Sequence, residues 1–518
     1  MASGQQPMTR RTVVSCFIIK FPPNASPLVA LFRRSDKVRT YQGRLAPISG
    51  SVDKADASPL HAAWREIAEE TCLTSANLTL LRQGKDYKFS DQSIGREWTI
   101  FPYAFGLNAP EDEANIQIDW EHTGFQWFDP RDVEDVDSFG GVPRLAESLR
   151  RVWFEVEIGE KRGRILNGGL LALRKDHESG ARQLAGTALD VLLDIVGESD
   201  KDLVTWWKNV RLAAWHLWKN GRESMGASIL NVVVRSLALV EEQVKRAKEN
   251  EVTQAFLRDV VNKLEAYKEL REESASGIWK TLEAFLRENE DASKPIRILT
   301  LSFSSTILNC LQRSIAGFGS EFDIRILESR PLFEGVSTAS KLVGGLTEAG
   351  VERDKRVNVS IYTDASAAIA SEDIDLLLIG ADLIDNAGAT SNKTGSLPAV
   401  LAAKHSSPGV KVLVLADSEK VLPYERPESE ENDAGEVVDA WRREESLRDA
   451  VATVMGSVSG DVAEEKGVRA SVKNVYFEWV PSSLIDGYLF EDGRKSSEDV
   501  SVLAGRIRRE ADAFFADV

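Results

Sequence analysis

The chain has 518 residues, too many for one ordinary domain core, so we expect two or three domains. With 43% apolar and 28% charged residues it has the composition of a globular protein, and no apolar run approaches the roughly 20 residues that span a bilayer, so we expect no membrane contact. The net charge of −17 argues against a broad nucleic-acid-binding surface, although a small cationic pocket for a phosphate stays open.

Residues 1–150 have the pattern of a small α/β domain. The strand-like runs are TVVSCFIIKF, SPLVALFRR and EWTIFPYAFGL, and one helical pattern lies near residues 59–72. Ser58 can cap this helix, and Pro59 suits its first turn, where a proline costs no hydrogen bond.

Three glutamates lie on one face of this expected helix. Glu66 and Glu70 are four residues apart, and Glu69 is three residues from Glu66. Like charges at these spacings repel by roughly 0.2–0.5 kcal/mol per pair. A divalent cation with a preference for oxygen ligands would turn that cost into a binding site. The alternative is a solvated acidic face on which Arg65 pairs with Glu69.

Residues 151–293 are dominated by long amphipathic helical patterns such as ILNVVVRSLALVEEQVKRAKE. Four tryptophans recur there at helical spacing, which favours an aromatic core or interface over a platform for nucleobases. They are Trp206, Trp207, Trp215 and Trp218.

In residues 294–518, β-rich runs alternate with helical segments, which is typical of a parallel sheet wrapped by helices. The acidic stretch ERPESEENDAGE opens an interruption near residues 425–470, which we interpret as a surface insertion. The expected fold class is therefore multidomain α/β.

The stretch GADLIDNAGATSNKTGS, residues 380–396, follows an apolar run. Asp382 lies at the carboxyl end of the expected strand, where open parallel sheets bind ligands. Free amides near Ser396, at the start of a helix, would attract phosphate, with Lys393 and Asn392 as further partners. Alternatively, Asp382 caps a turn and Lys393 is solvated.

The helix near residues 59–72 resembles the Nudix box, and the stretch WEHTGFQWFDP (120–130) is similar to one common late in Nudix domains. The residues that match the box are Arg65, Glu66, Ile67, Glu69, Glu70 and Leu73. The resemblance implies a Nudix-like α/β/α sandwich over about residues 10–150. It also implies Mg²⁺ or Mn²⁺ on Glu66, Glu69 and Glu70, for hydrolysis of a nucleoside diphosphate linked to another group.

The chain departs from the Nudix box at three positions. Ala57 stands where the first glutamate belongs, with Asp56 adjacent. Ser51 replaces the first glycine, with Gly50 one residue earlier, and Cys72 replaces the last. The departures leave open a hydrolase with a shifted substrate and a retired domain kept for ligand sensing or protein contacts.

About residues 163–518 resemble a superfamily that comprises the regulatory subunits of translation initiation factor 2B and two sugar-phosphate isomerases, of methylthioribose 1-phosphate and ribose 1,5-bisphosphate. The matching stretches are SGARQLA (179–185), GRESMGASILNVV (221–233), ILTLSFSS (298–305), ESRPLFEG (328–335), TDASAAI (363–369), 380–396 and FEWVPSSLIDGYLFEDG (477–493). The resemblance implies a helical part, a Rossmann-like sheet, a phosphorylated small-molecule ligand and at least a homodimer, with initiation factor subunits as further partners.

The isomerases carry a cysteine in the loop after the ILT strand, where this chain has Ser302. A hydroxyl is a far weaker acid than a thiol, so Ser302 argues against isomerase chemistry. The resemblance also predicts that Arg222 and Arg330 join Ser302 and the loop residues around a phosphate. Glu223 stands where the family has proline after the arginine, and its charge would weaken anion binding.

Three cysteines far apart predict a reducing compartment without a disulfide framework, and we expect a cytoplasmic protein. The leading interpretation is a phosphate-binding body fused to a Mg²⁺-dependent Nudix hydrolase. The alternative is a regulatory or assembly protein of translation initiation without enzyme activity. A sugar-phosphate isomerase comes third because of Ser302.

Overall fold

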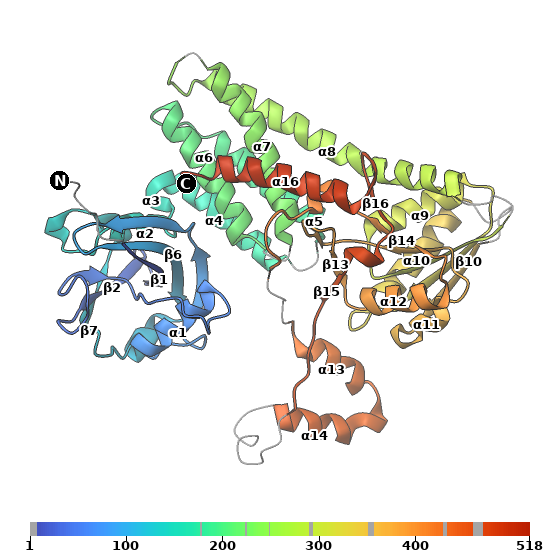
Figure 1. Ribbon diagram of the computed structural model, residues 1–518, viewed down its shortest axis with the longest axis horizontal. Helices are drawn as coiled ribbons and strands as arrows, with labels where there is room; N and C mark the ends of the chain where they lie inside the picture. The colour runs from blue at the N-terminus through green and yellow to red at the C-terminus, as the bar shows by residue number, and fades with distance from the viewer. Residues whose placement is uncertain are drawn as a thin grey trace, which may run out of the picture.

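In the computed structural model, a β-rich N-terminal domain lies beside a bundle of helices, and one long helix leads from the bundle to a parallel sheet covered by helices (Figure 1). Within the part of the chain that is described, no helix is long and apolar enough to cross a membrane. The described residues are 8–176, 179–222, 225–247, 249–289, 294–350, 357–427, 432–458 and 470–518.

The N-terminal sheet is built on β1 and β6, which run parallel along almost their whole length. Alternate residues of β1 pack on opposite faces: Cys16 and Ile18 meet α1, whereas Phe17 and Ile19 meet α2. The domain is thus the expected α/β/α sandwich. Its elements are β1 (Thr9–Lys20), β2 (Leu28–Arg34), β3 (Leu45–Ala46), α1 (Pro59–Thr71), β4 (Leu78–Gln83), β5 (Tyr87–Asp91), β6 (Arg96–Leu107), β7 (His122–Phe128) and α2 (Leu145–Arg150).

Helix α1 begins as predicted. The Ser58 hydroxyl accepts a hydrogen bond from the His61 amide, and Pro59 is the first helical residue. The helix ends at Cys72, whose φ of 59° lies in the left-handed region that glycine adopts more readily. The loss of the last box glycine therefore leaves the backbone turn unchanged.

The helical part packs around a large apolar cluster that also reaches the C-terminal sheet. Trp206, Trp215 and Trp218 are buried in it, which confirms the predicted aromatic core. The helices are α3 (Glu155–Ile158), α4 (Glu160–Lys175), α5 (Ala181–Val196), α6 (Leu203–Asn220), α7 (Gly226–Arg246) and α8 (Gln254–Asn289).

The C-terminal sheet has the order β10-β9-β8-β11-β14-β16-β17, and β17 alone pairs antiparallel. This arrangement confirms the predicted parallel sheet. Its strands are β8 (Ile296–Leu301), β9 (Phe322–Leu327), β10 (Val357–Tyr362), β11 (Leu376–Ile379), β14 (Lys411–Leu415), β16 (Gly487–Phe490) and β17 (Gly493–Lys495). The helices beside it include α9 (Ser305–Gly317), α10 (Glu334–Glu348), α11 (Ala367–Ala370) and α12 (Ser396–Ser406).

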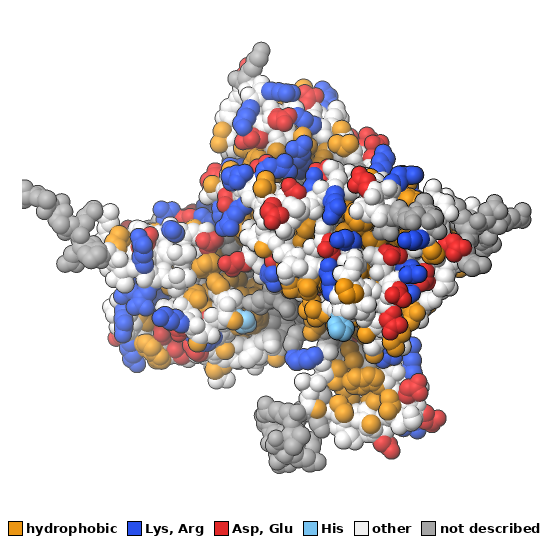
Figure 2. Space-filling view, turned by 45° about the vertical axis from the view of Figure 1, so that its right-hand side comes forward, with side chains coloured by type: hydrophobic (Ala, Val, Ile, Leu, Met, Phe, Trp, Pro, Cys, Tyr) orange, Lys and Arg blue, Asp and Glu red, His pale blue; other side chains and the backbone are white. Residues whose placement is uncertain are grey.

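A small antiparallel sheet lies beside the main one and carries the insertion. Its strands are β12 (Leu383–Ile384), β13 (Thr390–Lys393) and β15 (Phe477–Val480). Between β14 and β15, α13 (Ala434–Arg442) and α14 (Arg448–Val458) form a hairpin that projects from the body (Figure 1). Figure 2 shows hydrophobic side chains gathered on this hairpin, where Leu447 and Val454 are exposed. Residues 428–431 and 459–469 of the predicted insertion lie outside the described residues.

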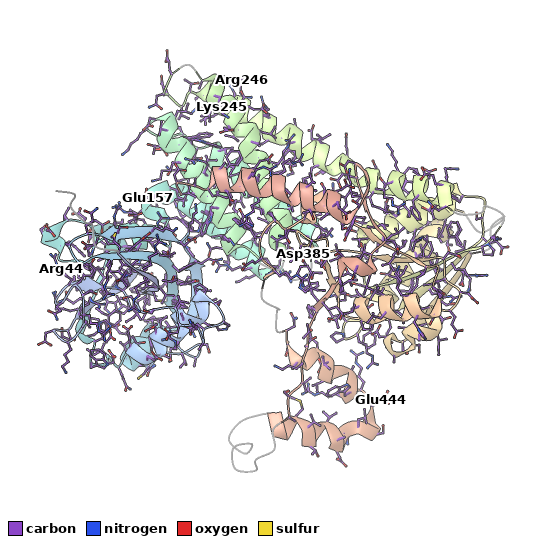
Figure 3. All side chains as sticks on the ribbon, in the orientation of Figure 1. Arg44, Glu157, Lys245, Arg246, Asp385 and Glu444 are labelled. Carbon is purple, nitrogen blue, oxygen red and sulfur yellow. The ribbon has the colours of Figure 1, made fainter. Side chains whose placement is uncertain are left out.

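Polar contacts join the N-terminal domain to the helices. Glu157, labelled in Figure 3, pairs there with Arg150 (Nε–Oε1 3.6 Å) and Lys208 (Nζ–Oε2 3.7 Å). The Gln83 amide donates to Asn220 Oδ1 (2.7 Å), and Asn220 Nδ2 donates back to the Gln83 carbonyl (2.9 Å). This reciprocal pair fixes the end of α6 on the end of β4.

The last helix, α16 (Ser497–Phe514), packs against α7 and leads the chain to the N-terminal domain (Figure 1). Beyond it, Asp517 pairs with Arg211 of α6, and the Val518 carbonyl accepts a hydrogen bond from Arg151 Nη1 (3.0 Å). The three parts of the molecule therefore meet at this segment.

Candidate functional site

Helix α1 turns its three predicted glutamates in two directions. The side chains of Glu66 and Glu70 are only 12% and 5% exposed, whereas that of Glu69 is 59% exposed. Glu69 pairs with Arg65 (Nη1–Oε2 3.2 Å), as the alternative interpretation predicted. The structure thus directs Glu66 and Glu70 into the domain and leaves Glu69 at the surface.

Glu66 packs directly against the backbone of Gly50. A Cβ atom at residue 50 would lie 1.9 Å from Glu66 Cδ, so this approach requires glycine there. Burial raises the pKa of Glu66, while Arg65 opposes the rise through a hydrogen bond of 2.8 Å from Nη1. Gly50, and not Ser51, therefore provides the close approach.

Glu70 is the most perturbed carboxyl group of the domain. Burial, followed by the charges of Glu121, Glu66 and Asp119, raises the pKa of Glu70 to about 9. Its Oε2 lies 2.6 Å from Nε2 of His122, whose pKa is lowered to about 4 by burial, so the imidazole is neutral at pH 7. The buried Nδ1 of His122 has no hydrogen-bond partner among the described residues. His122 therefore contacts the Glu70 carboxyl group through Nε2 alone.

The donor set of this cluster suits a divalent cation. Glu66, Glu70 and Glu121 bring carboxylates from α1 and from the turn before β7, and oxygen donors of this kind hold Mg²⁺ and Mn²⁺. Glu66 is hydrogen-bonded to Arg65, and Glu70 is hydrogen-bonded to His122. With the side chains in these positions, the described residues contain no group of three acidic, His or Cys side chains arranged to hold a metal. Glu121 was not among the predicted ligands, although WEHTGFQWFDP contains it.

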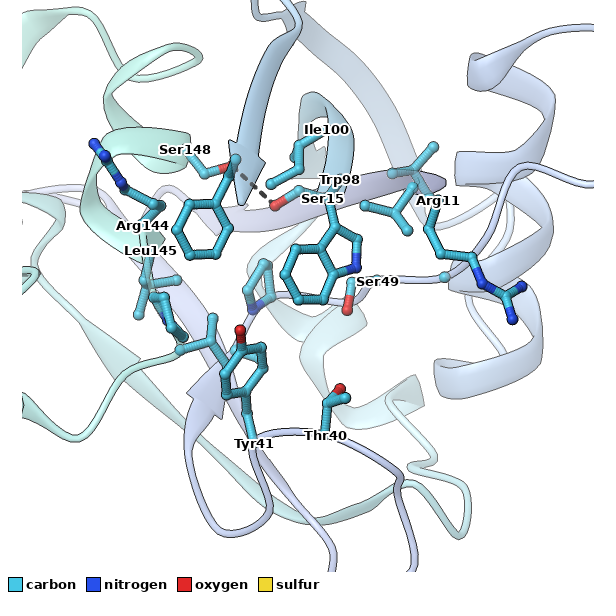
Figure 4. A pocket seen from close by; sticks show the side chains of 18 of the residues that line it. Arg11, Ser15, Thr40, Tyr41, Ser49, Trp98, Ile100, Arg144, Leu145 and Ser148 are labelled. Carbon is cyan, nitrogen blue, oxygen red and sulfur yellow. Dashed lines mark hydrogen bonds between the residues drawn. The ribbon is translucent and has the colours of Figure 1, made fainter. Parts of the chain in front are cut away.

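A cavity of about 300 Å³ is lined by Gly50 and by five arginines, of which Figure 4 labels Arg11 and Arg144. Arg11 of β1 stands opposite Trp98 of β6 in the parallel register, so both side chains point to this face. Arg11, Arg39 and Arg96 form no ion pair with any described residue. The cavity therefore presents unpaired cationic groups in a chain of net negative charge.

Aromatic rings complete one wall of this cavity. Phe89 and Trp98 stack with ring centroids 5.6 Å apart and planes 8° apart. Tyr41 lies against Trp98 and donates a hydrogen bond from its hydroxyl to Asp91 Oδ2 (2.8 Å). Ser15 and Ser148 join across the floor, as the dashed line in Figure 4 marks. Flat rings beside arginines can stack a nucleobase and bind its phosphates.

In the C-terminal part, Asp382 follows β11 at the carboxyl end of the parallel sheet. Burial raises the pKa of the Asp382 carboxyl. Three cationic side chains lie close enough to oppose that rise: Lys420, Lys393 and Arg222. Arg222 also donates from Nη1 to the Asp176 carbonyl (2.6 Å), and Glu223 lies outside the described residues. The structure thus brings Asp382, Lys393 and Arg222 together.

Lys393 has a carboxylate partner that we did not predict. Its Nζ lies 3.1 Å from Glu334 Oε1, and Ser302 donates from Oγ to Glu334 Oε2 (2.9 Å). Ser302 has a φ of 66°, a left-handed conformation that is uncommon for serine and is found at functional sites. Glu334 therefore contacts both Lys393 and Ser302, which we predicted to bind a phosphate.

The predicted amide site at the start of α12 is also engaged by a carboxylate. The amides of Gly395 and Leu397 donate to Glu478 Oε1 at 2.6 and 3.0 Å. Asn392 donates from Nδ2 to the Ser396 hydroxyl (2.8 Å). An acidic side chain at a helix N-terminus satisfies the same amide groups as a phosphate does. These amides therefore already have an acceptor in Glu478 of β15.

Arg330 does not converge on Asp382. Its side chain is 54% exposed, pairs with Glu328 (Nε–Oε1 3.1 Å) and lies over the Phe333 ring. Arg330 is therefore missing from the expected set of seven residues around a phosphate, and Lys420 contributes a cationic side chain near Asp382 instead.

Two family models match the chain. Residues 177–496 match the Initiation factor 2 subunit family, and residues 9–152 match the NUDIX domain. Both resemblances found in the sequence are thereby confirmed.

Individual relatives cover less of the chain. It is 27% identical over 206 residues to ribose 1,5-bisphosphate isomerase of Haloterrigena turkmenica, covering 40% of this chain and 56% of that protein. It is 28% identical to methylthioribose-1-phosphate isomerase of Leptospira interrogans, covering 35% of this chain and 46% of that protein. Translation initiation factor eIF-2B of Pyrococcus horikoshii OT3 aligns with a TM-score of 0.42 and 18% identity over 64% of this chain and 96% of that chain. The chain spans about half the length of the curated relatives it matches.

Proposed function

Because the chain belongs to the Initiation factor 2 subunit family through residues 177–496 and carries a NUDIX domain over residues 9–152, we propose that it hydrolyses nucleoside-diphosphate-linked compounds in the N-terminal cavity. One observation carries this proposal. The arginine-lined cavity includes Gly50, which packs against the Glu66 carboxyl group. Gly50 thus adjoins both the arginines that would bind phosphate and the Glu66 carboxylate that would take part in catalysis.

The residues of the cavity have separate roles in this reaction. Arg11 and Arg96 bind phosphoryl oxygens, and Trp98 stacks the base. The raised pKa of Glu66 makes it a stronger base than an exposed glutamate. A divalent cation held by Glu66, Glu70 and Glu121, Mg²⁺ or Mn²⁺, would supply charge neutralisation at the phosphate and an activated water.

Arg11 and Arg10 offer a matched test of the cavity. They are neighbours in β1, but Arg11 lines the cavity, whereas Arg10 is exposed on the other face and pairs with Glu97. Replacing Arg11 by Gln should raise KM about tenfold to a hundredfold, since it removes a charged hydrogen bond to phosphate. Arg10→Gln should leave KM unchanged. Equal effects of the two variants on steady-state kinetics would show that the cavity does not bind the substrate.

A second function is supported by the charges around Asp382. Lys420, Lys393 and Arg222 surround this carboxyl group, and the relatives named above as sugar-phosphate isomerases support a pocket for a sugar or nucleoside phosphate. The pocket has no isomerase activity in our proposal, because Ser302 offers a hydroxyl that already donates to Glu334.

Variants of Lys393 and Glu334 should change the affinity of this pocket for phosphate in opposite directions. Lys393→Ala should weaken phosphate binding about tenfold to a hundredfold, as expected for a charged hydrogen bond. Glu334→Gln should strengthen it, because it releases Lys393 from its 3.1 Å ion pair. Calorimetry over pentose, hexose and nucleoside monophosphates measures both. If no compound binds at millimolar concentration, or Lys393→Ala changes nothing, Asp382 is only a structural cap.

We propose that the protein assembles through its Rossmann-like half, at least as a homodimer and with initiation factor subunits as candidate partners. The support is membership of a family whose members include initiation factor subunits. Light scattering on the purified chain should give twice the mass of the chain or more. A monomer at micromolar concentration would refute the homodimer.

A further inference from the structure

The turn before α1 carries a carboxylate beside the position at which the Nudix box has its first glutamate. Ala57 stands at that position, and Asp56 precedes it. The Asp56 side chain is only 8% exposed, whereas that of Asp53, in the same turn, is 67% exposed. We infer that Asp56 supplies the acidic group that is lost at Ala57 and, through Arg65, positions the Glu66 carboxylate for a divalent cation.

Arg65 joins Asp56 to Glu66. The guanidinium group donates to Asp56 through Nε (Nε–Oδ1 3.1 Å) and Nη2 (Nη2–Oδ2 2.9 Å), and its Nη1 donates to Glu66 Oε1 (2.8 Å). Further bonds run from Nη2 to the Ser51 carbonyl (2.9 Å) and from Nη1 to Glu69 Oε2 (3.2 Å). A guanidinium group has five N–H groups, so each of them has an acceptor here. Any rotation of Arg65 away from this position would therefore break several bonds at once.

Asp56 is itself held by the backbone of the turn. Its Oδ2 accepts a hydrogen bond from the Asp53 amide (2.8 Å), and its own amide donates to the Asp53 carbonyl (3.1 Å). Hydrogen bonds from the Arg65 side chain and the Asp53 backbone lower the pKa of Asp56, so the carboxylate is charged at pH 7. Its two oxygens therefore fix the plane of the guanidinium group, as bidentate arginine–carboxylate pairs do.

This position of Arg65 leaves one oxygen of Glu66 available to a cation. Oε1 accepts the bond from Arg65, whereas Oε2 accepts no hydrogen bond from any described residue. The carboxyl group also packs against Gly50, which limits its other orientations. Without the Asp56 carboxylate, Arg65 would be free to turn toward Glu66 and compete with a cation for both oxygens. Asp56 thus acts through Arg65 and is a positioning residue.

The inference rests on the proposed hydrolase, in which Glu66 is a ligand of the cation. Replacing a group that orients a metal ligand without contacting the metal typically weakens metal binding about tenfold to a hundredfold. Asp56→Asn should therefore weaken Mn²⁺ binding to the full chain at least about tenfold, as measured by calorimetry. It should also lower kcat with little change in KM, because the arginines that would bind phosphate stay in place.

Asp53→Asn is the matched control, because it removes an equal charge from the same turn. The Asp53 carboxylate is exposed and lies 3.9 Å from Arg65 Nη2, too far for a hydrogen bond. An exposed ion pair of this kind contributes little, so Mn²⁺ affinity should stay within about twofold of the natural value. The control therefore separates the loss of the fork from the loss of a nearby negative charge.

Two further variants test the path from Asp56 to Glu66. Adding Ala57→Glu to Asp56→Asn returns a carboxylate to the position of the box glutamate and should restore most of the Mn²⁺ affinity. Arg65→Lys keeps the positive charge, but an ammonium group cannot span both carboxylates, so it should weaken Mn²⁺ binding about as much as Asp56→Asn does.

The outcomes separate this inference from the proposed hydrolase. The inference alone is overturned if the natural chain binds Mn²⁺ and either Asp56→Asn or Arg65→Lys binds it equally well. It is also overturned if Asp53→Asn loses as much affinity as Asp56→Asn, or if the added Ala57→Glu restores none. A lowered melting temperature of Asp56→Asn with unchanged Mn²⁺ affinity would show a merely structural role. If the natural chain binds no Mn²⁺, the proposed hydrolase and the inference are both overturned.

Discussion

Replacing Glu70 by Gln should lower the rate of Mg²⁺-dependent hydrolysis about a hundredfold to a thousandfold, the loss expected when one charge-stabilising group is removed from an active site. Glutamine keeps the size of the side chain, and its amide can still contact His122, which now lies 2.6 Å from the carboxyl oxygen. The variant therefore removes a group that can ionise beside a bound cation, with little change in packing. The initial rate of phosphate-product release measures the effect.

Glu69→Gln is the matched control, because Glu69 lies one residue away on the same helix but faces the solvent. Its rate should stay close to that of the natural chain. If Glu70→Gln folds normally and hydrolyses as fast as Glu69→Gln, then the buried carboxylates have no part in the reaction.

Without divalent cations, Glu70 should make the fold less stable as the pH rises from about 4.5 to about 9, the interval between its ordinary pKa and its pKa in the folded chain. Within this interval the folded chain retains a proton that the unfolded chain has released. Stability therefore falls with rising pH, and above the folded pKa this carboxyl group causes no further change. Glu70→Gln lacks this dependence, so its advantage in melting temperature should grow from about pH 5 to about pH 8.

Thermal melts in a chelating buffer measure this difference. Added Mg²⁺ should shrink it, because a bound cation favours the ionised carboxylate. Glu69→Gln should follow the natural chain at every pH. Parallel pH profiles for Glu70→Gln and the natural chain would show that Glu70 ionises freely and is not held in an acidic cluster.

Local features of the sequence predicted the fold well, because the signals are short-range. Ser58 and Pro59 define the start of α1, and both act as expected. The apolar runs of the C-terminal part became the strands of the parallel sheet, since a run buried on both faces has a distinct composition.

The candidate sites were predicted only in part, because they depend on long-range contacts. Spacing places Glu66, Glu69 and Glu70 on one broad face, but burial decides that Glu69 alone turns to the solvent. Glu334 and Glu478 are far in sequence from the loop that they engage. No local pattern relates such carboxylates to Lys393 or to the amides of α12.

The most direct test of the account is incubation of the full chain with a panel of nucleoside-diphosphate-linked compounds and Mg²⁺, followed by measurement of the phosphate products. We predict that at least one compound is cleaved at its diphosphate, that cleavage requires the cation, and that it is lost in Glu70→Gln. If no compound is cleaved while phosphate ligands still bind at Asp382, the hydrolase assignment is contradicted and the protein is a regulatory member of its family without enzyme activity.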